Sequence, residues 1–188
     1  SWVDWDDRKS CVLFGDGAGA VALQSSYTED HLIGFKFRSD GARGDCLTLP
    51  KTRNFQPLVQ GNNFQIGNFS PINMNGQEVY KFAVREVPAI LEDLLKINQI
   101  NSESLDWLLL HQANKRIIDA VAARLKIPQS KVLTNLANYG NTSAATIPLM
   151  LDEAVRDQRI HKNNLIATSG FGAGLSWGAA LIKWHGPV

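Results

Sequence analysis

Two short polar motifs hold the side chains of this sequence that are best suited to chemistry. The first is HQAN at residues 111–114, and the second is GNTSAA at residues 140–145. Each follows an apolar or loop segment and opens a predicted helix. In a layered α/β fold, that placement sets polar groups at the carboxyl ends of strands, where such folds bind ligands. His111 and Asn141 together supply neutral hydrogen-bond donors, which suit a carbonyl oxygen that becomes negative during a reaction.

Each of these groups also has a plain structural explanation. His111 follows three leucines at the inner end of a buried strand, so it is either a functional group or a core histidine with satisfied hydrogen bonds. Asn141 follows a glycine, a pairing that is common in turns and helix caps. A glycine-rich loop at residues 170–174 either brings backbone N–H groups toward a reacting oxygen or forms a simple hairpin. The remaining histidines, at positions 31, 161 and 185, lie in polar or terminal contexts typical of a surface.

Composition excludes several classes of function. The 19 basic and 18 acidic residues nearly cancel, and no basic run is interleaved with aromatics, so we expect no nucleic-acid partner. No apolar stretch is long enough to span a bilayer. Cys11 and Cys46 lie far apart without metal-ligand spacing, which favours a reducing, cytoplasmic location and no bound metal. The sequence contains no nucleophile elbow and no phosphate-binding P-loop.

Hydrophobic periodicity predicts the elements that position the two motifs. The clearest is a helix over residues 76–98, which Pro88 should kink. Two more amphipathic helices are expected at 114–126 and 142–159, with strands at 31–38, 106–110, 165–169 and 177–184. Together these elements indicate an α/β fold with a mixed sheet.

Two further segments lack helical periodicity. Residues 10–25 predict a strand at 11–14, a glycine turn at 15–19 and a strand at 20–23. The turn lacks the spacing and the following helix of a dinucleotide fingerprint, so tight backbone packing is the favoured interpretation of its glycines. Residues 49–71 are rich in Asn, Gln, Gly and Pro without a clear period. Their aromatics, Phe55, Phe64 and Phe69, favour an ordered cap over a pocket.

The sequence does not begin with Met, and its strand pattern starts almost at once. We therefore expect it to be a piece of a longer protein.

Four motifs together carry a family resemblance. FGDGAGA (14–20), HQAN (111–114), GNTSA (140–144) and GFGAGLSWG (170–178) resemble those of β-ketoacyl-acyl-carrier-protein synthase III, of the thiolase superfamily. They occur in the family's order and cover nearly the whole chain. The resemblance implies a thiolase-like layered fold, with a mixed β-sheet between helices. Residues 1–30 would be the last strands of an N-terminal half, and residues 31–188 the C-terminal half.

The resemblance also implies an activity. Family members condense acyl-CoA, here expected to be acetyl-CoA, with malonyl-acyl-carrier protein in a decarboxylative Claisen reaction that starts fatty-acid chains. No bound cofactor is implied. Partners would be CoA thioesters, acyl carrier protein and the half that supplies the nucleophilic cysteine, within a homodimer when complete. Neither Cys11 nor Cys46 has the nucleophile's context, so this chain alone would be catalytically incomplete.

Matched by position, the resemblance implies roles for particular residues. His111 and Asn141 would be the other members of a Cys-His-Asn triad. Phe171 would form an apolar wall near the malonyl carboxylate, and the backbone N–H of Ala173 would face the acyl-transfer oxyanion. The residues implied for CoA and pantetheine are Arg8, Met74, Gly76 and Asn114, and those for the carrier protein are Lys81, Arg116 and Arg124, supported by Arg85 and Lys115. Ala123 replaces one basic residue of the family.

Two alternatives remain open at this point. One is a related synthase of secondary metabolism, or one that uses a longer or branched primer, with residues 49–71 reshaping the acyl pocket. The other is a non-catalytic module that binds CoA or carrier protein.

Overall fold

A five-stranded mixed sheet is the centre of the molecule, which we describe from a computed structural model covering residues 2–26, 29–59 and 62–186. Its strand order is β1-β9-β8-β6-β7. The strands are β1 (Leu32–Ser39), β6 (Trp107–Leu110), β7 (Val132–Leu133), β8 (Leu165–Gly172) and β9 (Ser176–Lys183). β6 runs parallel to β7 and β8, whereas β9 is antiparallel to β8 and β1. The predicted mixed sheet is confirmed.

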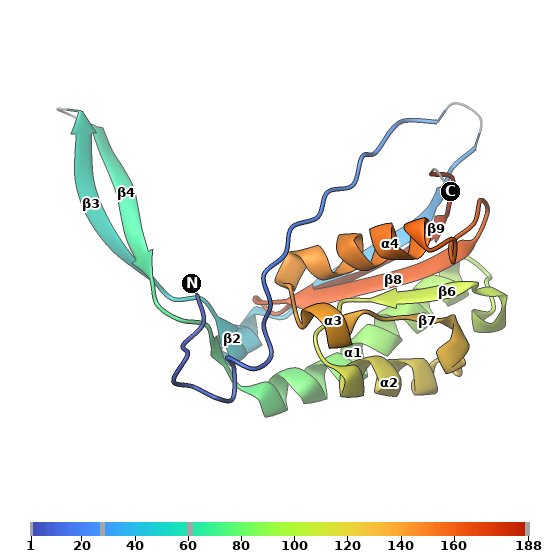
Figure 1. Cartoon of the computed structure of the whole chain (residues 1–188), viewed down its shortest axis with the longest axis horizontal. Coiled ribbons are helices and arrows are strands. Elements are labelled where there is room, and N and C mark those ends of the chain that lie inside the picture. The colour runs from blue at the N-terminus through green and yellow to red at the C-terminus, as the bar shows by residue number, and fades with distance from the viewer. Residues whose placement is uncertain (1, 27–28, 60–61, 187–188) are drawn as a thin grey trace.

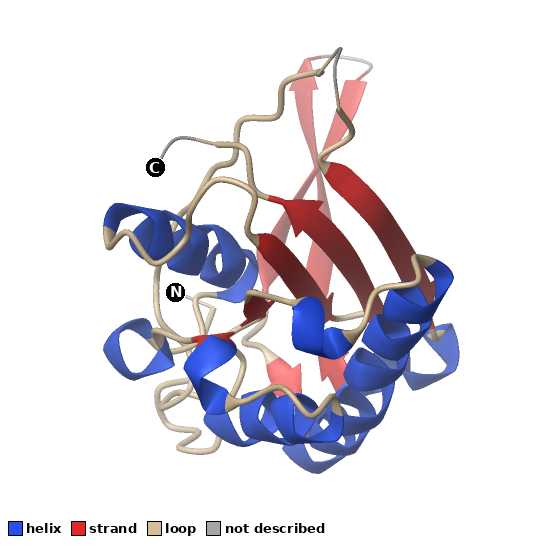
Figure 2. Cartoon of the chain, turned by 90° about the vertical axis from the view of Figure 1, so that its right-hand side faces the viewer, coloured by secondary structure: helices blue, strands red, loops and turns tan. Residues whose placement is uncertain are grey.

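Helices cover both faces of this sheet (Figures 1 and 2). On one face lie α1 (Gly76–Ile97) and α2 (Lys115–Arg124), and on the other lies α4 (Thr146–Arg156). Successive side chains of β6 point to opposite faces of the sheet. Leu108 and Leu110 pack into the core beneath α1 and α2, whereas Leu109 packs with α4. This layered arrangement, a mixed sheet between helices, is the one that the sequence predicts.

The long helix α1 forms because its apolar residues recur on one side. Val79, Phe82, Ala83, Val87, Ile90, Leu91, Leu94 and Leu95 are all buried. The side chain of Asn75 caps its N-terminus by accepting a hydrogen bond from the backbone N–H of Glu78, at 3.2 Å. The helix continues through Pro88 without interruption.

The two other predicted helices are shorter than expected at their starts. Asn114 is the N-cap of α2, and residues 143–145 form a 3-10 turn before α4 begins. Sequence reasoning missed the short elements α3 (Leu136–Tyr139), β2 (Leu47–Thr48) and β5 (Asn73–Met74), together with 3-10 turns at Gly41–Cys46, Ser102–Ser104 and Gln129–Lys131. It also missed β7.

The insert at residues 49–71 is a β-hairpin. Its strands β3 (Lys51–Val59) and β4 (Asn62–Phe69) pair in an antiparallel ladder and project away from the sheet (Figure 1). The side chains of Phe55, Phe64 and Phe69, from which we expected a cap, lie outside the described residues.

Residues 2–26 form no strand in this structure where the sequence predicts strands at 11–14 and 20–23. Residues 8–13 form turns, Phe14 makes one isolated bridge to Asn141, and residues 15–26 run as extended chain. A strand needs a neighbour to complete its hydrogen bonds, and within the described ranges none pairs with residues 20–23. Val21 and Leu23 are accordingly exposed, at 56% and 93%.

Tight backbone packing of the glycine turn agrees with the structure. A Cβ placed on Gly15 would lie 2.0 Å from the carbonyl oxygen of Tyr139, and one on Gly19 would lie 2.6 Å from Pro148. These glycines therefore let the segment pass directly against the C-terminus of α3 and against α4.

No helix in the described part of the chain is long and apolar enough to cross a membrane.

Gln112 ties together the carboxyl ends of β6 and β7. Its side chain is fully buried, and its Nε2 donates to the carbonyl oxygens of Leu110, at 2.6 Å, and Leu133, at 3.4 Å. Its Oε1 accepts from the backbone N–H of Asn135, at 3.3 Å. The Gln112 side chain therefore satisfies three backbone groups close to His111.

We expect Gln112→Ala to lower the free energy of unfolding by about 2–3 kcal/mol, because the buried backbone groups lose their partner. Urea denaturation measures the change. Gln129→Ala, on an exposed 3-10 turn, is the matched control and should leave stability nearly unchanged. Equal stability of the two variants would contradict the role of Gln112.

Candidate active site

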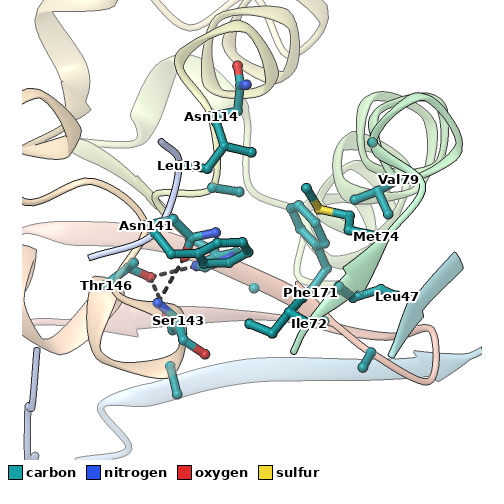
Figure 3. A pocket seen from close by; sticks show the side chains of 18 of the residues that line it. Leu13, Leu47, Ile72, Met74, Val79, Asn114, Asn141, Ser143, Thr146 and Phe171 are labelled. Atoms are coloured by element: carbon teal, nitrogen blue, oxygen red, sulfur yellow. Dashed lines mark hydrogen bonds between the residues drawn. The ribbon is translucent and has the colours of Figure 1, made fainter. Parts of the chain in front are cut away.

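A cavity of about 460 Å³ opens at the carboxyl ends of β6 and β8. Its walls come from the ends of these strands, the start of α1, the 3-10 turn before α4, and the segment that contains Leu13 and Phe14. Apolar side chains predominate, and His111 and Asn141 are among the polar ones. Figure 3 shows Asn141, Ser143 and Thr146 on one side of this space and Phe171, Met74 and Val79 on the other. The structure therefore brings together the two residues that the sequence singled out first.

His111 is fixed in position by both its backbone and its ring. Its backbone N–H donates to the carbonyl oxygen of Ser169, at 2.9 Å, which continues the pairing of β6 with β8. Its Nδ1 lies 2.6 Å from the hydroxyl oxygen of Thr146, and its ring meets the ring of Phe171 edge-on, with centroids 5.3 Å apart. The imidazole thus has one orientation, in which Nδ1 faces α4.

Burial lowers the pKa of His111 from 6.5 to about 4, because the cationic form would lose its hydration. The ring is therefore neutral near pH 7, with one nitrogen as a donor and the other as an acceptor.

The backbone of Asn141 is held in place by hydrogen bonds to the segment that contains Leu13 and Gly15. Its backbone N–H donates to the carbonyl oxygen of Leu13, at 2.9 Å, and its carbonyl oxygen accepts from the N–H of Gly15, at 3.0 Å. Its side-chain Oδ1 accepts from the N–H of Ser143, at 2.9 Å. Since the amide oxygen is already bonded, the NH₂ group is the part of the side chain left to donate.

Phe171 and Ala173 both line the cavity from the end of the β8–β9 hairpin. Phe171 continues an aromatic stack, because Phe82 of α1 meets it edge-on with centroids 6.0 Å apart. The hairpin tip is tied down where Leu175 and Asp40 exchange backbone hydrogen bonds of 3.0 and 2.8 Å. The glycine-rich loop is thus a hairpin whose tip lines the cavity.

The structure places the predicted CoA and pantetheine residues in two groups. Met74, Gly76 and Asn114 line the cavity, whereas Arg8 is exposed in a turn and is not among the lining residues. Trp2, which the sequence did not suggest, lines the cavity instead, and its carbonyl oxygen accepts from the N–H of Ile72, at 2.9 Å.

The predicted carrier-protein residues differ in their partners. Lys81 forms an ion pair with Glu78, at 2.8 Å, and Arg124 forms one with Glu92, at 3.1 Å. The guanidinium of Arg116 instead lies over the ring of Tyr80, with Cζ 5.2 Å from the centroid. Tyr80 lines the cavity. Of these three cations, Arg116 is therefore the one that contacts a cavity-lining residue and has no ion-pair partner among the described residues.

Thr146 is the site residue that sequence reasoning missed. It is buried, with 2% exposure, and it touches His111 across 35 residues of sequence. A hydroxyl within an Ala-rich helix start was a weak signal, and only the packing of α4 on the sheet brings it to His111.

The described residues contain no group of three or more His, Cys, Asp or Glu side chains that could hold a metal ion. Cys11 and Cys46 are free thiols, and neither is among the residues that line the cavity.

Two family models match the chain. The model described as 3-oxoacyl-[acyl-carrier-protein (ACP)] synthase III C terminal matches residues 95–184, and the model described as 3-oxoacyl-[acyl-carrier-protein (ACP)] synthase III matches residues 1–41.

Similar proteins agree with these matches. A β-ketoacyl-[acyl-carrier-protein] synthase III of Prochlorococcus marinus strain MIT 9313 is 72% identical over 100% of this chain and 56% of its own length. The one from Synechococcus sp. strain WH7803 is 66% identical over 100% of this chain and 55% of its own. The chain thus spans about half the length of the curated relatives it matches.

Solved structures show the same relationship. The 3-oxoacyl-[acyl-carrier-protein] synthase III of Aquifex aeolicus VF5 superposes with a TM-score of 0.84 at 36% identity, covering 97% of this chain and 54% of that one. The synthase III of Pseudomonas aeruginosa PAO1 superposes with a TM-score of 0.85 at 34% identity, covering 100% and 55%.

The layered sheet and the cavity at its edge thus define a thiolase-like chain. Within that class, the chain belongs to the 3-oxoacyl-[acyl-carrier-protein] synthase III family.

The lowered pKa of His111 predicts the pH at which its ring titrates. In the intact protein that carries this sequence, we expect the NMR signals of the His111 ring to titrate with a midpoint near pH 4, not 6.5. The pKa of His111 is lower in the folded state than in the unfolded state. The free energy of unfolding is therefore unaffected by this residue above about pH 6.5 and decreases as the pH falls from there toward 4, because the unfolded chain takes up the proton first. The slope is at most about 1.4 kcal/mol per pH unit.

The spectrum of His111→Gln identifies the signals, and urea unfolding of this variant should lack that part of the pH dependence. A His111 midpoint above pH 6 would show that the ring is not desolvated.

Proposed function

We propose that this chain supplies the His-Asn part of the active site of a β-ketoacyl-acyl-carrier-protein synthase III. The intact enzyme would condense acyl-CoA, with acetyl-CoA as the expected primer, with malonyl-acyl-carrier protein and release carbon dioxide. The nucleophilic cysteine would come from the half that this chain lacks. The observation that supports this most directly is the convergence of His111 and Asn141 on one cavity from two separate loops.

Loss of carbon dioxide from a malonyl thioester leaves its electron pair on the α-carbon, delocalised as an enolate onto the thioester oxygen. His111 and the Asn141 NH₂ group would both donate to that oxygen. Each such preorganised donor is worth roughly 3 kcal/mol of transition-state stabilisation.

Phe171 would act on the other end of the same substrate. Its ring offers an apolar wall beside His111, so a malonyl carboxylate placed against it would lose hydration. The desolvated carboxylate is then less stable relative to neutral carbon dioxide. The backbone N–H of Ala173 would face the oxyanion of the acyl-transfer step.

The thioester arm would reach these groups through the mouth of the cavity. Met74, Gly76 and Asn114 line the route that a pantetheine chain would follow, with Arg8 as a more distant contact for the CoA nucleotide. Arg116, beside Tyr80, would meet an acidic carrier protein at the entrance. Lys81 and Arg124 would add weaker attraction because neighbouring carboxylates already neutralise them.

The decisive experiment follows the two half-reactions separately. After incubation with acetyl-CoA, the intact protein should gain one acetyl group by mass spectrometry, on a cysteine outside this chain. His111→Ala and Asn141→Ala should each slow malonyl decarboxylation by about 100-fold or more, since each removes one donor to the enolate.

Asn138→Ala, which changes an exposed asparagine on α3, is the matched control and should retain full activity. An intact protein that neither accepts an acetyl group nor releases carbon dioxide would refute the proposed function and favour a binding module.

The pairing of the basic residues predicts their ranking. Arg116→Ala should lower kcat/KM for malonyl-acyl-carrier protein more than Lys81→Ala or Arg124→Ala. Of the three, only Arg116 has no ion pair with a carboxylate in the described part of the chain. The three variants should behave alike toward malonyl-CoA, which has no carrier protein. Steady-state kinetics at low and high salt measure both effects, because screening weakens such attraction. Equal losses for all three would contradict the ranking.

A further inference from the structure

The proposed reaction requires His111 to point an N–H at the substrate oxygen, and a neutral imidazole has one N–H. Nδ1 faces α4, 2.6 Å from the Thr146 hydroxyl. No hydrogen-bond partner of Nε2 lies among the described residues, and His111 lines the cavity. The proton must therefore be on Nε2 if His111 is to donate, which requires Nδ1 to accept.

We propose that Thr146 is a positioning residue whose hydroxyl donates to Nδ1 of His111, so that Nε2 carries the proton and becomes the donor aimed at the enolate oxygen. This inference rests on the proposed function.

The hydroxyl of Thr146 has one proton and two acceptors within reach. One is Nδ1 of His111, at 2.6 Å, and the other is the carbonyl oxygen of Ser143, at 3.0 Å. That carbonyl already accepts from the backbone N–H of Thr146, at the end of the 3-10 turn. With the proton on Nε2, Nδ1 can only accept, and the Thr146 hydroxyl is the donor that lies beside it, whereas the carbonyl of Ser143 keeps its backbone partner.

The surroundings hold this contact in place. Thr146 is 2% exposed, and its backbone is fixed where the 3-10 turn passes into α4. The hydroxyl is uncharged, so it can hold the ring and donate to Nδ1 without favouring the imidazolium. A carboxylate at the same place would instead favour the charged ring.

The same turn orients the second donor. The backbone N–H of Ser143 holds the Oδ1 of Asn141, and Thr146 follows three residues later. One short segment thus directs both proposed donors, the amide through a backbone N–H and the imidazole through a hydroxyl.

The test uses Thr146→Val and Thr146→Ser in the intact protein. Valine keeps the shape of threonine without the hydroxyl, and serine keeps the hydroxyl. We expect Thr146→Val to lower kcat for malonyl decarboxylation by about tenfold or more with KM little changed, because the donor is no longer held in its tautomer. Thr146→Ser should restore activity to within about threefold of the unsubstituted protein.

A spectroscopic reading separates this role from mere packing. With ¹⁵N-labelled histidine, and His111→Gln to assign the signals, the shifts should show a protonated Nε2 and an unprotonated Nδ1 in the unsubstituted protein. A proton on Nδ1, or a Thr146→Val enzyme that decarboxylates at the unsubstituted rate, would overturn the proposal. Should Thr146→Val fail to fold, the spectrum of the unsubstituted protein still decides it.

The outcomes also distinguish this inference from the function on which it rests. An unsubstituted protein that does not decarboxylate malonyl thioesters refutes the function. The nitrogen spectrum of the same sample still reports which ring nitrogen of His111 carries the proton.

Discussion

The parallel pairing of β6 with β8 is the constraint on which the site depends. Leu110 pairs with Ser169, and the backbone hydrogen bond from His111 to Ser169 extends that ladder one residue beyond β6. β8 continues past this point, so Phe171 comes to lie beside the His111 ring. A slip of one residue would turn every side chain of β6 to the opposite face. Because the leucines of β6 are buried on both faces, it is the register of the β6–β8 ladder, and no alternation of apolar and polar residues, that sets the position of the imidazole.

The second donor depends on a different constraint, the close approach of two backbones. Asn141 exchanges hydrogen bonds with Leu13 and Gly15, and a side chain at Gly15 would collide with the carbonyl of Tyr139. Gly140 itself has a φ of +67°, which favours glycine. The glycines of the 14–20 motif therefore serve a site that lies more than 100 residues away in sequence.

The parts of the fold that could be predicted from sequence are those in which side-chain periodicity decides the structure. α1 was predicted nearly to the residue because its buried face is long and apolar, and the strand before His111 was clear from three consecutive leucines. The hairpin β3–β4 was missed because it contains residues that are depleted in strands, such as Pro57 and Gly67, and because a backbone ladder leaves no mark on composition. The strands expected at 11–14 and 20–23 do not form among the described residues, since a strand-like pattern forms a strand only beside a partner.

The residues of the candidate site likewise differ in whether the sequence could predict them. His111 and Asn141 stood out because their residue types and positions after predicted elements indicate chemistry. Thr146 did not, because its importance lies in a contact across the layer between α4 and the sheet, which no local pattern reveals. Arg116 differs from Lys81 and Arg124 only in the neighbours that the fold gives it, so its distinction was also invisible in the sequence.

The absence of charge on the two proposed donors has a physical consequence for the proposed reaction. A lysine or arginine at either position would attract the malonyl carboxylate strongly in the ground state, and such uniform binding does not raise kcat. A neutral imidazole and an amide interact more strongly as negative charge moves from the carboxylate to the thioester oxygen. Burial, which lowers the pKa of His111 to about 4, preserves that neutrality. The apolar packing that stabilises the fold therefore also tunes the site, since the desolvation that keeps the ring uncharged comes from the same layers that hold it in place.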